Sequence, residues 1–166
     1  MSCEIKWALN KMPKTEDKNL PIMSVVEVKK ARAFHESIPQ YQVTPLADLK
    51  NMAEYLGLAK ACVKDESYRF GLNAFKVLGG SYAIARYIAK ETKRDISQMP
   101  YSVLTCRELR DEFGQATFFS ATDGNHGRGV AWAANRLGQK CVIRMPVGST
   151  ENRRRHIEDE GAECTI

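Results

Sequence analysis

Residues 116–146 read ATFFSATDGNHGRGVAWAANRLGQKCVIRMP and carry the clearest secondary-structure pattern in the chain. A β-rich run at 116–121 leads through a glycine-bearing loop into a helical run at 127–137. A second strand-like run follows at 139–145, and Pro146 stops it. Strands that alternate with helices of this length pair in parallel, so the stretch predicts a β-α-β unit and an α/β fold.

The same alternation extends to both sides of this unit. The other expected elements are helices over 24–38, from Pro45 to near Gly57, over 73–90 and over 150–160, and strands over 59–64 and 162–166. Ligand sites of α/β folds lie at the carboxyl ends of the strands. The loops that follow 59–64 and 116–121 are therefore the places to search for functional residues.

Length and composition limit the class of protein. A chain of 166 residues corresponds to about one domain, and its hydrophobic content of 43% is enough for a packed core. No apolar run approaches the roughly 18 residues of a spanning helix, and residues 1–19 are charged and mixed, without the apolar core of a signal peptide. We therefore expect a cytoplasmic protein without a membrane partner.

Charge and cysteine usage exclude further classes. The net charge of +5 is spread along the chain, and its densest basic run, 153–155, is followed at once by the acidic run 158–160. This pattern is typical of a solvated helix face, so no nucleic-acid partner is predicted. The five cysteines form no C-x-x-C pair and are odd in number, which indicates reduced thiols.

A first candidate site follows the 59–64 strand, in residues 64–76, KDESYRFGLNAFK. Asn73 is a good N-cap, which places Lys76 near the third helical position. There the helix dipole disfavours an ammonium group by about 0.3 to 1 kcal/mol, and a neutral amine is the form that attacks an aldehyde. Lys76 is therefore a candidate nucleophile, although a surface lysine in a first helical turn is the commoner explanation of such a position alone.

A second candidate site is residues 120–129, SATDGNHGRG. Glycine in a helical first turn costs about 1 kcal/mol relative to alanine, but it lets the backbone approach a flat ligand closely. Asn125 can present hydrogen-bonding groups there, at a helix N-terminus. The alternative is a capped turn, with Asp123 as N-cap, Gly124 at positive φ and His126 at the surface.

Other kinds of site are not indicated. The glycine order G-x-x-G-x-G differs from the G-x-G-x-x-G of dinucleotide binders, and neither a Walker A loop nor a G-x-S-x-G elbow is present. The three histidines, His35, His126 and His156, are too widely spaced to indicate a metal site.

These strings resemble a known family, the fold-type II pyridoxal-phosphate enzymes that include tryptophan synthase β and threonine dehydratase. The matching elements, in order, are VTPL at 43–46, VKDE at 63–66, NAFK at 73–76 and DGNHG at 123–127. Longer strings closely resemble diaminopropionate ammonia-lyases: RFGLNAFK at 69–76, LGGSYA at 78–83 and TDGNHGRGVAW at 122–132. Generic dehydratases carry Ser-Phe-Lys and Ser-x-Gly-Asn-His at the corresponding places.

The resemblance implies a fold and a domain organisation. The fold would be the α/β fold of type II, incomplete in this chain, with a parallel sheet that has helices on both faces. Residues 1–75 would belong to the large domain and residues 76–166 would form a small αβα domain, with the C-terminal part of the large domain absent. Complete members of the family are expected to be homodimers.

The resemblance also implies a role for each site residue. Lys76 would bind pyridoxal 5'-phosphate covalently and act as the base on the α-proton of an L-substrate. Asn125 would bond the 3-hydroxyl of the cofactor, with Gly124 and His126 beside it, and Asp123 would be the opposite-face base for the D-isomer. The implied reaction is the α,β-elimination of 2,3-diaminopropionate to pyruvate and ammonia.

Two alternatives to this function stay open. One is a threonine or serine dehydratase. The other is an inactive truncated fragment, because family members continue beyond residue 166 and carry there the glycine-rich loop that binds the cofactor phosphate. For the covalent anchor, Lys64 is the alternative to Lys76.

Overall fold

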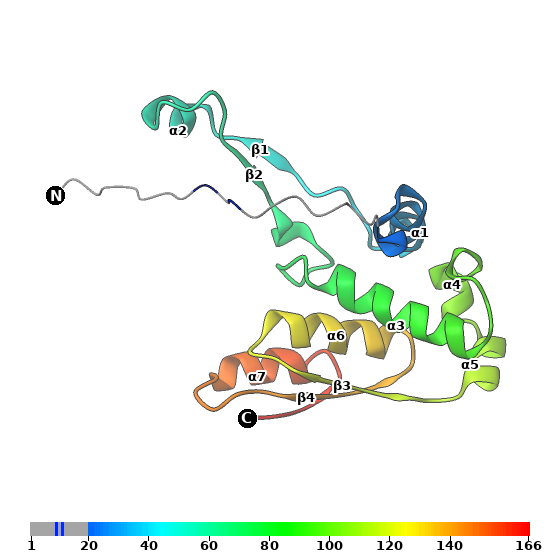
Figure 1. The fold of residues 1–166 in the computed structure, drawn as a ribbon. Coiled ribbons are helices and arrows are strands. Elements are labelled where there is room, and N and C mark those ends of the chain that lie inside the picture. Colours follow the sequence, from blue (N-terminus) through cyan, green and yellow to red (C-terminus); the bar gives the residue numbers. More distant parts are fainter. Residues whose placement is uncertain (1–8, 10, 12–19) are drawn as a thin grey trace.

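The computed structural model describes Leu9, Lys11 and residues 20–166. A three-stranded parallel sheet forms one side of the molecule, with its strands in the order β3 (Thr117–Ala121), β4 (Lys140–Arg144) and β5 (Glu163–Thr165). Helix α6 (Asn125–Arg136) joins β3 to β4, and α7 (Glu151–Glu158) joins β4 to β5. Both helices lie on the same face of the sheet (Figure 1).

The burial pattern of the strands explains this arrangement. In β4, Cys141 and Ile143 are buried on the face that the helices cover, whereas Lys140 and Arg144 are exposed. Helix α6 buries residues 129–134 without interruption, because it has the sheet on one side and another helix on the other. The sequence therefore places α6 at the centre of the molecule.

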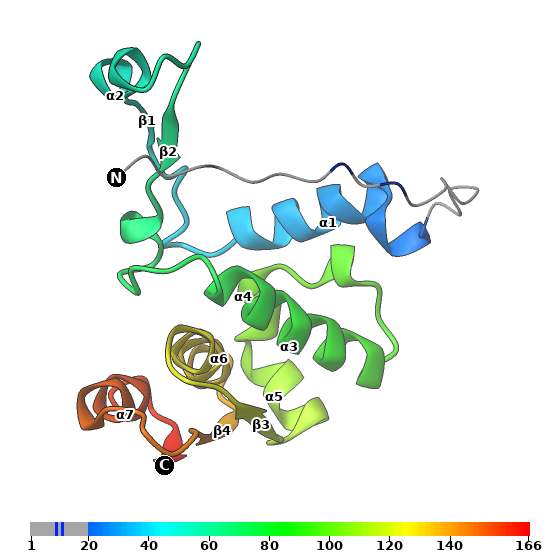
Figure 2. The same cartoon turned by 60° about the vertical axis from the view of Figure 1, so that its left-hand side comes forward.

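Further helices form additional layers above α6. Helix α3 (Val77–Glu91) packs on α6, and α1 (Val25–Glu36) packs on α3 (Figure 2). The remaining short helices are α4 (Tyr101–Leu104), α5 (Arg107–Phe113) and the 3-10 helices η1 (Pro21–Met23), η2 (Glu66–Tyr68) and η3 (Ile96–Gln98). Ser24 caps the N-terminus of helix α1, because its side chain accepts a hydrogen bond from the backbone N–H of Glu27 (3.3 Å).

A two-stranded antiparallel arm projects from this body (Figure 1). Strand β1 (Leu46–Asp48) pairs with β2 (Cys62–Lys64), and α2 (Lys50–Tyr55) lies between them in the chain. All residues of both strands are exposed. We refer to residues 46–64 as the arm.

The α/β fold class and the parallel pairing that the sequence predicts are confirmed. Helices α1, α6 and α7 and strands β3, β4 and β5 lie within a few residues of their expected positions. The sequence did not predict β1, which has no alternation of buried and exposed residues, or the short helices between residues 96 and 113.

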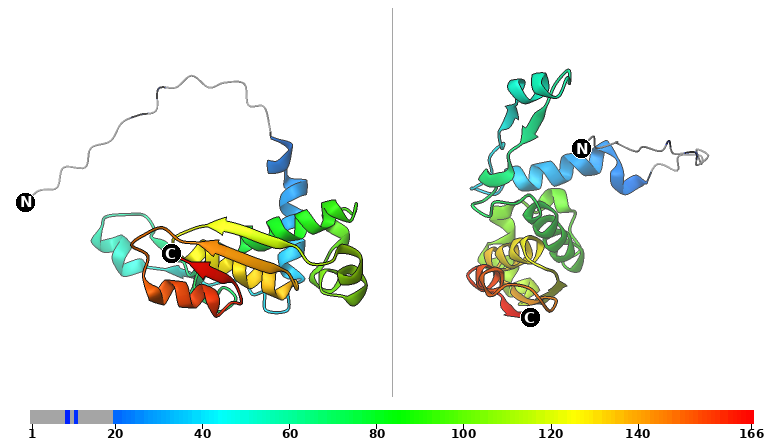
Figure 3. Two further views of the ribbon diagram at one scale, coloured as in Figure 1. Left: turned by 90° about the horizontal axis from the view of Figure 1, so that it is seen from below. Right: turned by 90° about the vertical axis from the view of Figure 1, so that its left-hand side faces the viewer.

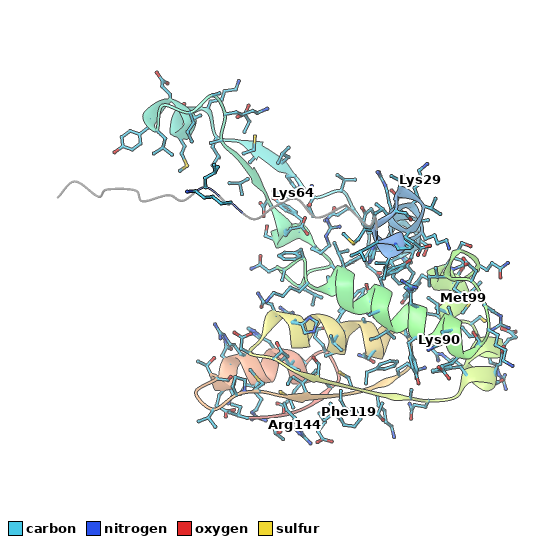
Figure 4. All side chains as sticks on the ribbon, in the orientation of Figure 1. Lys29, Lys64, Lys90, Met99, Phe119 and Arg144 are labelled. Atoms are coloured by element: carbon cyan, nitrogen blue, oxygen red, sulfur yellow. The ribbon has the colours of Figure 1, made fainter. Side chains whose placement is uncertain are left out.

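Two expectations are wrong. The long helix does not start at Asn73 but at Val77, and Asn73 itself has a φ angle of 56° that no right-handed helix contains. Lys76 is therefore the N-cap residue of α3, and the expectation that Asn73 caps the helix with Lys76 near its third position is wrong. The helix expected from Pro45 to near Gly57 is also too long, because residues 46–48 form strand β1 and α2 spans only Lys50–Tyr55. In the part of the chain that the structure describes, the helices cover one face of the sheet (Figure 3). On the open face, Phe119 is 73% exposed and points away from the helices, as does Arg144 (Figure 4).

The structure describes only part of the residues on which the membrane and cysteine predictions rest. Among the described helices, none has the length and apolar character needed to cross a bilayer. Four cysteines, Cys62, Cys106, Cys141 and Cys164, are free thiols, and Cys3 lies outside the described residues. Most of residues 1–19, expected to lack a signal peptide, also lies outside them.

Candidate active site

Lys76 and Asn125 line the same pocket, although they are far apart in the sequence. The pocket has a volume of about 280 Å³, and its other lining residues are Asp65, Glu66, Ser67, Asn73, Ala74 and Phe75. Lys76 directly precedes α3, and Asn125 is the first residue of α6. The pocket thus lies where the N-termini of two helices meet, downstream of β2 and β3, as the sequence predicts for the loops after these strands.

Glycines allow the two helix N-termini to lie this close together. A Cβ atom on Gly129 of α6 would lie 2.8 Å from Cα and 2.9 Å from N of Val77, the first residue of α3. On the other helix, a Cβ atom on Gly80 would lie 3.2 Å from Cγ2 of Val130. The helices therefore pack backbone against backbone next to Lys76.

This packing corrects our interpretation of the glycine-rich loop. Gly127 and Gly129 are both buried. A Cβ atom on Gly127 would lie 2.5 Å from Cγ2 of Thr122 and 3.0 Å from Cγ2 of Ile143. The two glycines are thus required by contacts within the protein, and the prediction that they make room for a flat ligand is wrong for them.

The start of α6 also differs from the capped turn that we considered. Gly124, not Asp123, is the N-cap residue, and no side chain caps the helix. Asp123 is exposed in the turn after β3, where its backbone carbonyl accepts a hydrogen bond from Nη1 of Arg153 (3.4 Å). The carboxylate of Asp123 therefore has no role in the capping of this helix.

The candidate site residues do not all face the same space. His126 lines a second cavity of about 270 Å³, which is bounded by residues of α3, β3 and α6 that include Gly80, Tyr87 and Phe119. Neither Asp123 nor Gly124 is among the residues that line this cavity or the Lys76 pocket. The structure brings Lys76 together with Asn125 in one pocket, whereas His126 lines the other cavity.

The sequence reasoning missed a buried ionic network behind the Lys76 pocket. Arg69 is 5% exposed and Thr44 is 2% exposed. Glu66 accepts hydrogen bonds from Nε of Arg69 (2.8 Å) and from Oγ1 of Thr44 (2.6 Å). The Glu66-x-x-Arg69 spacing was the available signal, since residues three apart on a helical turn face each other.

Hydrogen bonds favour the charged form of two carboxylates at the pocket, those of Glu66 and Asp65. The hydrogen bond from Arg69, together with that from Thr44, lowers the pKa of Glu66 despite its partial burial. Hydrogen bonds from the side chain and backbone N–H of Ser67 lower the pKa of Asp65. The pocket that Lys76 lines is therefore also lined by two negatively charged side chains.

The alternative anchor, Lys64, lies at the base of the arm (Figure 4). Its amine donates a hydrogen bond to the backbone carbonyl of Thr44. Lys64 is not among the residues that line the Lys76 pocket. Of the two lysines, only Lys76 shares a pocket with Asn125.

The family profile described as "Pyridoxal-phosphate dependent enzyme" matches residues 38–166 of the chain. A diaminopropionate ammonia-lyase of Salmonella typhimurium is 51% identical over 134 residues, which are 81% of this chain and 33% of that relative. A diaminopropionate ammonia-lyase of Escherichia coli (strain K12) is 48% identical over 147 residues, which are 88% of this chain and 36% of that relative.

Solved structures show the same likeness. The crystal structure of the holo diaminopropionate ammonia-lyase from Escherichia coli matches with a TM-score of 0.80 at 46% identity, covering 89% of this chain and 36% of that chain. The same enzyme in complex with D-serine matches with a TM-score of 0.79. The chain spans about a third of the length of the curated relatives that it matches. It belongs to the family of pyridoxal-phosphate-dependent enzymes.

Proposed function

We propose that this chain carries the Lys76–Asn125 part of the active site of a diaminopropionate ammonia-lyase. The observation that carries the proposal is the shared pocket of Lys76 and Asn125 at the meeting point of two helix N-termini. The 48% and 51% identity to diaminopropionate ammonia-lyases supports this specific reaction over that of a threonine or serine dehydratase.

The residues of the pocket fit the reactive end of pyridoxal phosphate. The amine of Lys76 can bond an aldehyde covalently, and the amide of Asn125 can hydrogen-bond a ring hydroxyl. Among the described residues that line the pocket, Lys76 is the sole cation, and Asp65 and Glu66 line the pocket with it. We therefore assign the phosphate-binding groups to parts of the relatives that this chain does not span. When bound, the cofactor supplies an electron sink for the negative charge that develops at the substrate Cα atom.

Two side chains of the protein would accept the α-proton, one on each face of the substrate. In the proposed reaction, Lys76 removes the α-proton of the L-isomer and Asp123 removes that of the D-isomer. The β-amino group leaves as ammonia, and hydrolysis releases the α-amino group as ammonia and the carbon skeleton as pyruvate. The complex of the Escherichia coli relative with D-serine supports access of a D-amino acid to the site.

Borohydride trapping tests the anchor. We expect the chain, mixed with pyridoxal phosphate and reduced with borohydride, to carry a pyridoxyl group on Lys76, and the Lys76→Ala variant to carry none at the corresponding peptide. Trapping at Lys64 in place of Lys76 would show that the anchor is misassigned. Absence of specific trapping would favour the inactive-fragment alternative.

Product analysis tests the substrate. We expect pyruvate from 2,3-diaminopropionate to form much faster than pyruvate from serine or 2-oxobutyrate from threonine, when the chain is part of a complete enzyme. The opposite order would favour the dehydratase alternative.

We also propose the domain organisation and setting of this enzyme. Residues 1–75 belong to the large domain, residues 76–166 form the small domain, and the complete protein is a cytoplasmic homodimer. The start of α3 at Val77 supports the domain division, and the four free cysteines among the described residues support a reducing compartment.

A further inference from the structure

The segment that leads into Lys76 has an unusual backbone. Phe70 and Asn73 are left-handed, with φ angles of 52° and 56°. For a bulky residue such as Phe70 this conformation is rare and costs on the order of 1 kcal/mol or more, so the surrounding contacts must hold it in place.

The aromatic ring of Phe70 has two partners that bear on its position. It stacks on Trp132 of α6, with ring centroids 4.9 Å apart and an interplanar angle of 27°. The guanidinium carbon of Arg69 lies 5.9 Å from the centroid of the Phe70 ring. The ring is therefore in contact with a buried cation and with the helix that begins with Asn125.

Arg69 is itself fixed by several partners. Its guanidinium group donates to both carboxylate oxygens of Glu66, to the backbone carbonyl of Gln42 (2.9 Å) and to Oγ1 of Thr44 (3.2 Å). It also lies over the ring of Tyr41, 5.3 Å from the centroid. Only the planar fork of arginine can satisfy these partners at the same time.

The backbone after Arg69 links the fixed position of Arg69 to the segment that carries Lys76. The N–H of Leu72 donates to the carbonyl of Arg69 (2.9 Å), and the side chain of Leu72 is buried. From Leu72 the chain continues through the left-handed Asn73 to Lys76. Displacement of Arg69 or of Phe70 would thus free the segment that carries the lysine.

We propose that Arg69 is a positioning residue for Lys76, which acts by holding Phe70 against Trp132 and so fixes Lys76 relative to Asn125. This inference rests on the proposed role of Lys76. It assigns no contact with substrate or cofactor to Arg69.

The test compares two arginines that lie over the stacked rings of Phe70 and Trp132: Arg69 lies over Phe70, and Arg136 lies over Trp132. Arg69→Lys keeps the charge but loses the fork. Arg136→Lys is the matched control, because Arg136 is exposed and its guanidinium carbon lies 5.5 Å from the centroid of the same Trp132 ring. Among the described residues, Arg136 forms no ion pair with the segment 69–76. Phe70→Leu removes the stacked ring and leaves the ion pair intact, in case Arg69→Lys fails to fold.

The first measurement is hydrogen exchange of the full chain without cofactor. We expect the amides of residues 70–78 to exchange at least about tenfold faster in Arg69→Lys and Phe70→Leu, while amides of β4 and all amides of Arg136→Lys are unchanged. Unchanged exchange of residues 70–78 in the folded variants would overturn the proposal, as would an equal effect of Arg136→Lys.

The second measurement is borohydride trapping of pyridoxal phosphate, quantified at Lys76 relative to Lys90. Lys90 is exposed near the other end of α3 and reports non-specific labelling. We expect the Lys76 to Lys90 ratio to fall about tenfold in Arg69→Lys and in Phe70→Leu only; a constant ratio would overturn the positioning role. If the unaltered chain shows no preference for Lys76, the proposed function fails, and hydrogen exchange still decides whether Arg69 orders the segment.

Discussion

Gly129 of α6 lies directly against the backbone of Val77, the residue that follows Lys76. A Cβ atom at Gly129 would lie 2.8 Å from the Cα atom of Val77, closer than real Cβ atoms approach backbone. Backbone atoms within two packed helices cannot move aside as a flexible side chain can. The absence of a side chain at Gly129 thus allows the close packing of α3 and α6. Lys76 directly precedes α3, and Asn125 is the first residue of α6.

Gly129→Ala should therefore destabilise the protein in spite of the higher helix propensity of alanine. We expect a loss of about 1 to 3 kcal/mol in the free energy of unfolding, measured by urea denaturation, and weaker trapping of pyridoxal phosphate at Lys76. The control is Gly79→Ala in α3, where a Cβ atom would meet nothing within 4 Å. That variant should gain up to about 1 kcal/mol. A gain in both variants would show that α3 and α6 can separate freely.

Asp123→Asn should change the stereochemical preference of a complete enzyme. The carboxylate of Asp123 does not cap α6, and asparagine has nearly the same shape, so we expect little change in stability. Turnover of D-2,3-diaminopropionate should fall by about 10² to 10⁴, the range for loss of a general base, while turnover of the L-isomer stays within a few-fold. The measurement is pyruvate release from each isomer. Equal losses for both isomers would argue against Asp123 as the base for the D-isomer.

Burial raises the pKa of the Cys141 thiol to about 11, from an ordinary value of 9.0. The unfolded chain loses this proton at lower pH than the folded chain does. The contribution of Cys141 to stability is therefore complete below pH 9 and is lost as the pH rises through about 11. We expect this loss to be about 1 to 3 kcal/mol, measured as the change in unfolding free energy relative to Cys141→Val. Identical pH dependence of the two proteins would contradict the prediction.

His35 of α1 should make stability depend on pH in the acid range. Its Nε2–H donates to the backbone carbonyl of Leu78 in α3 (2.9 Å), and burial lowers its pKa from the ordinary value of 6.5. Below pH 6.5 the unfolded chain takes up a proton that the folded chain does not, so stability falls as the pH is lowered. His35→Gln keeps a donor for Leu78 but does not titrate. Its unfolding free energy should lack this part of the pH dependence.

The sequence predicted the body of the fold well because burial there follows simple periods. In β4, buried Cys141 and Ile143 alternate with exposed residues, and α6 is apolar along its middle. Strand β1 was missed because it is held by pairing with β2 alone and buries no side chain.

The candidate site was predictable only in part. Lys76 and Asn125 both follow strands, and the order of strands and helices in the chain indicates that such positions meet. The left-handed conformation of Phe70 was not predictable, because it depends on Trp132 and Arg69 and not on the intrinsic preference of phenylalanine. The packing roles of Gly127 and Gly129 were not predictable either, because contacts of α6 with Thr122, Ile143 and Val77 leave no trace in the local sequence.

The arm has a consequence for handling the protein. Its two strands bury no residue, and in α2 only Ala53 is buried, while Tyr55 is 89% exposed. A two-stranded ribbon with so little packing opens far more often than the body does. Within the arm, trypsin should therefore cleave at exposed Lys60. The nicked polypeptide should keep its parallel sheet, so that partial digestion of a preparation would pass unnoticed by circular dichroism.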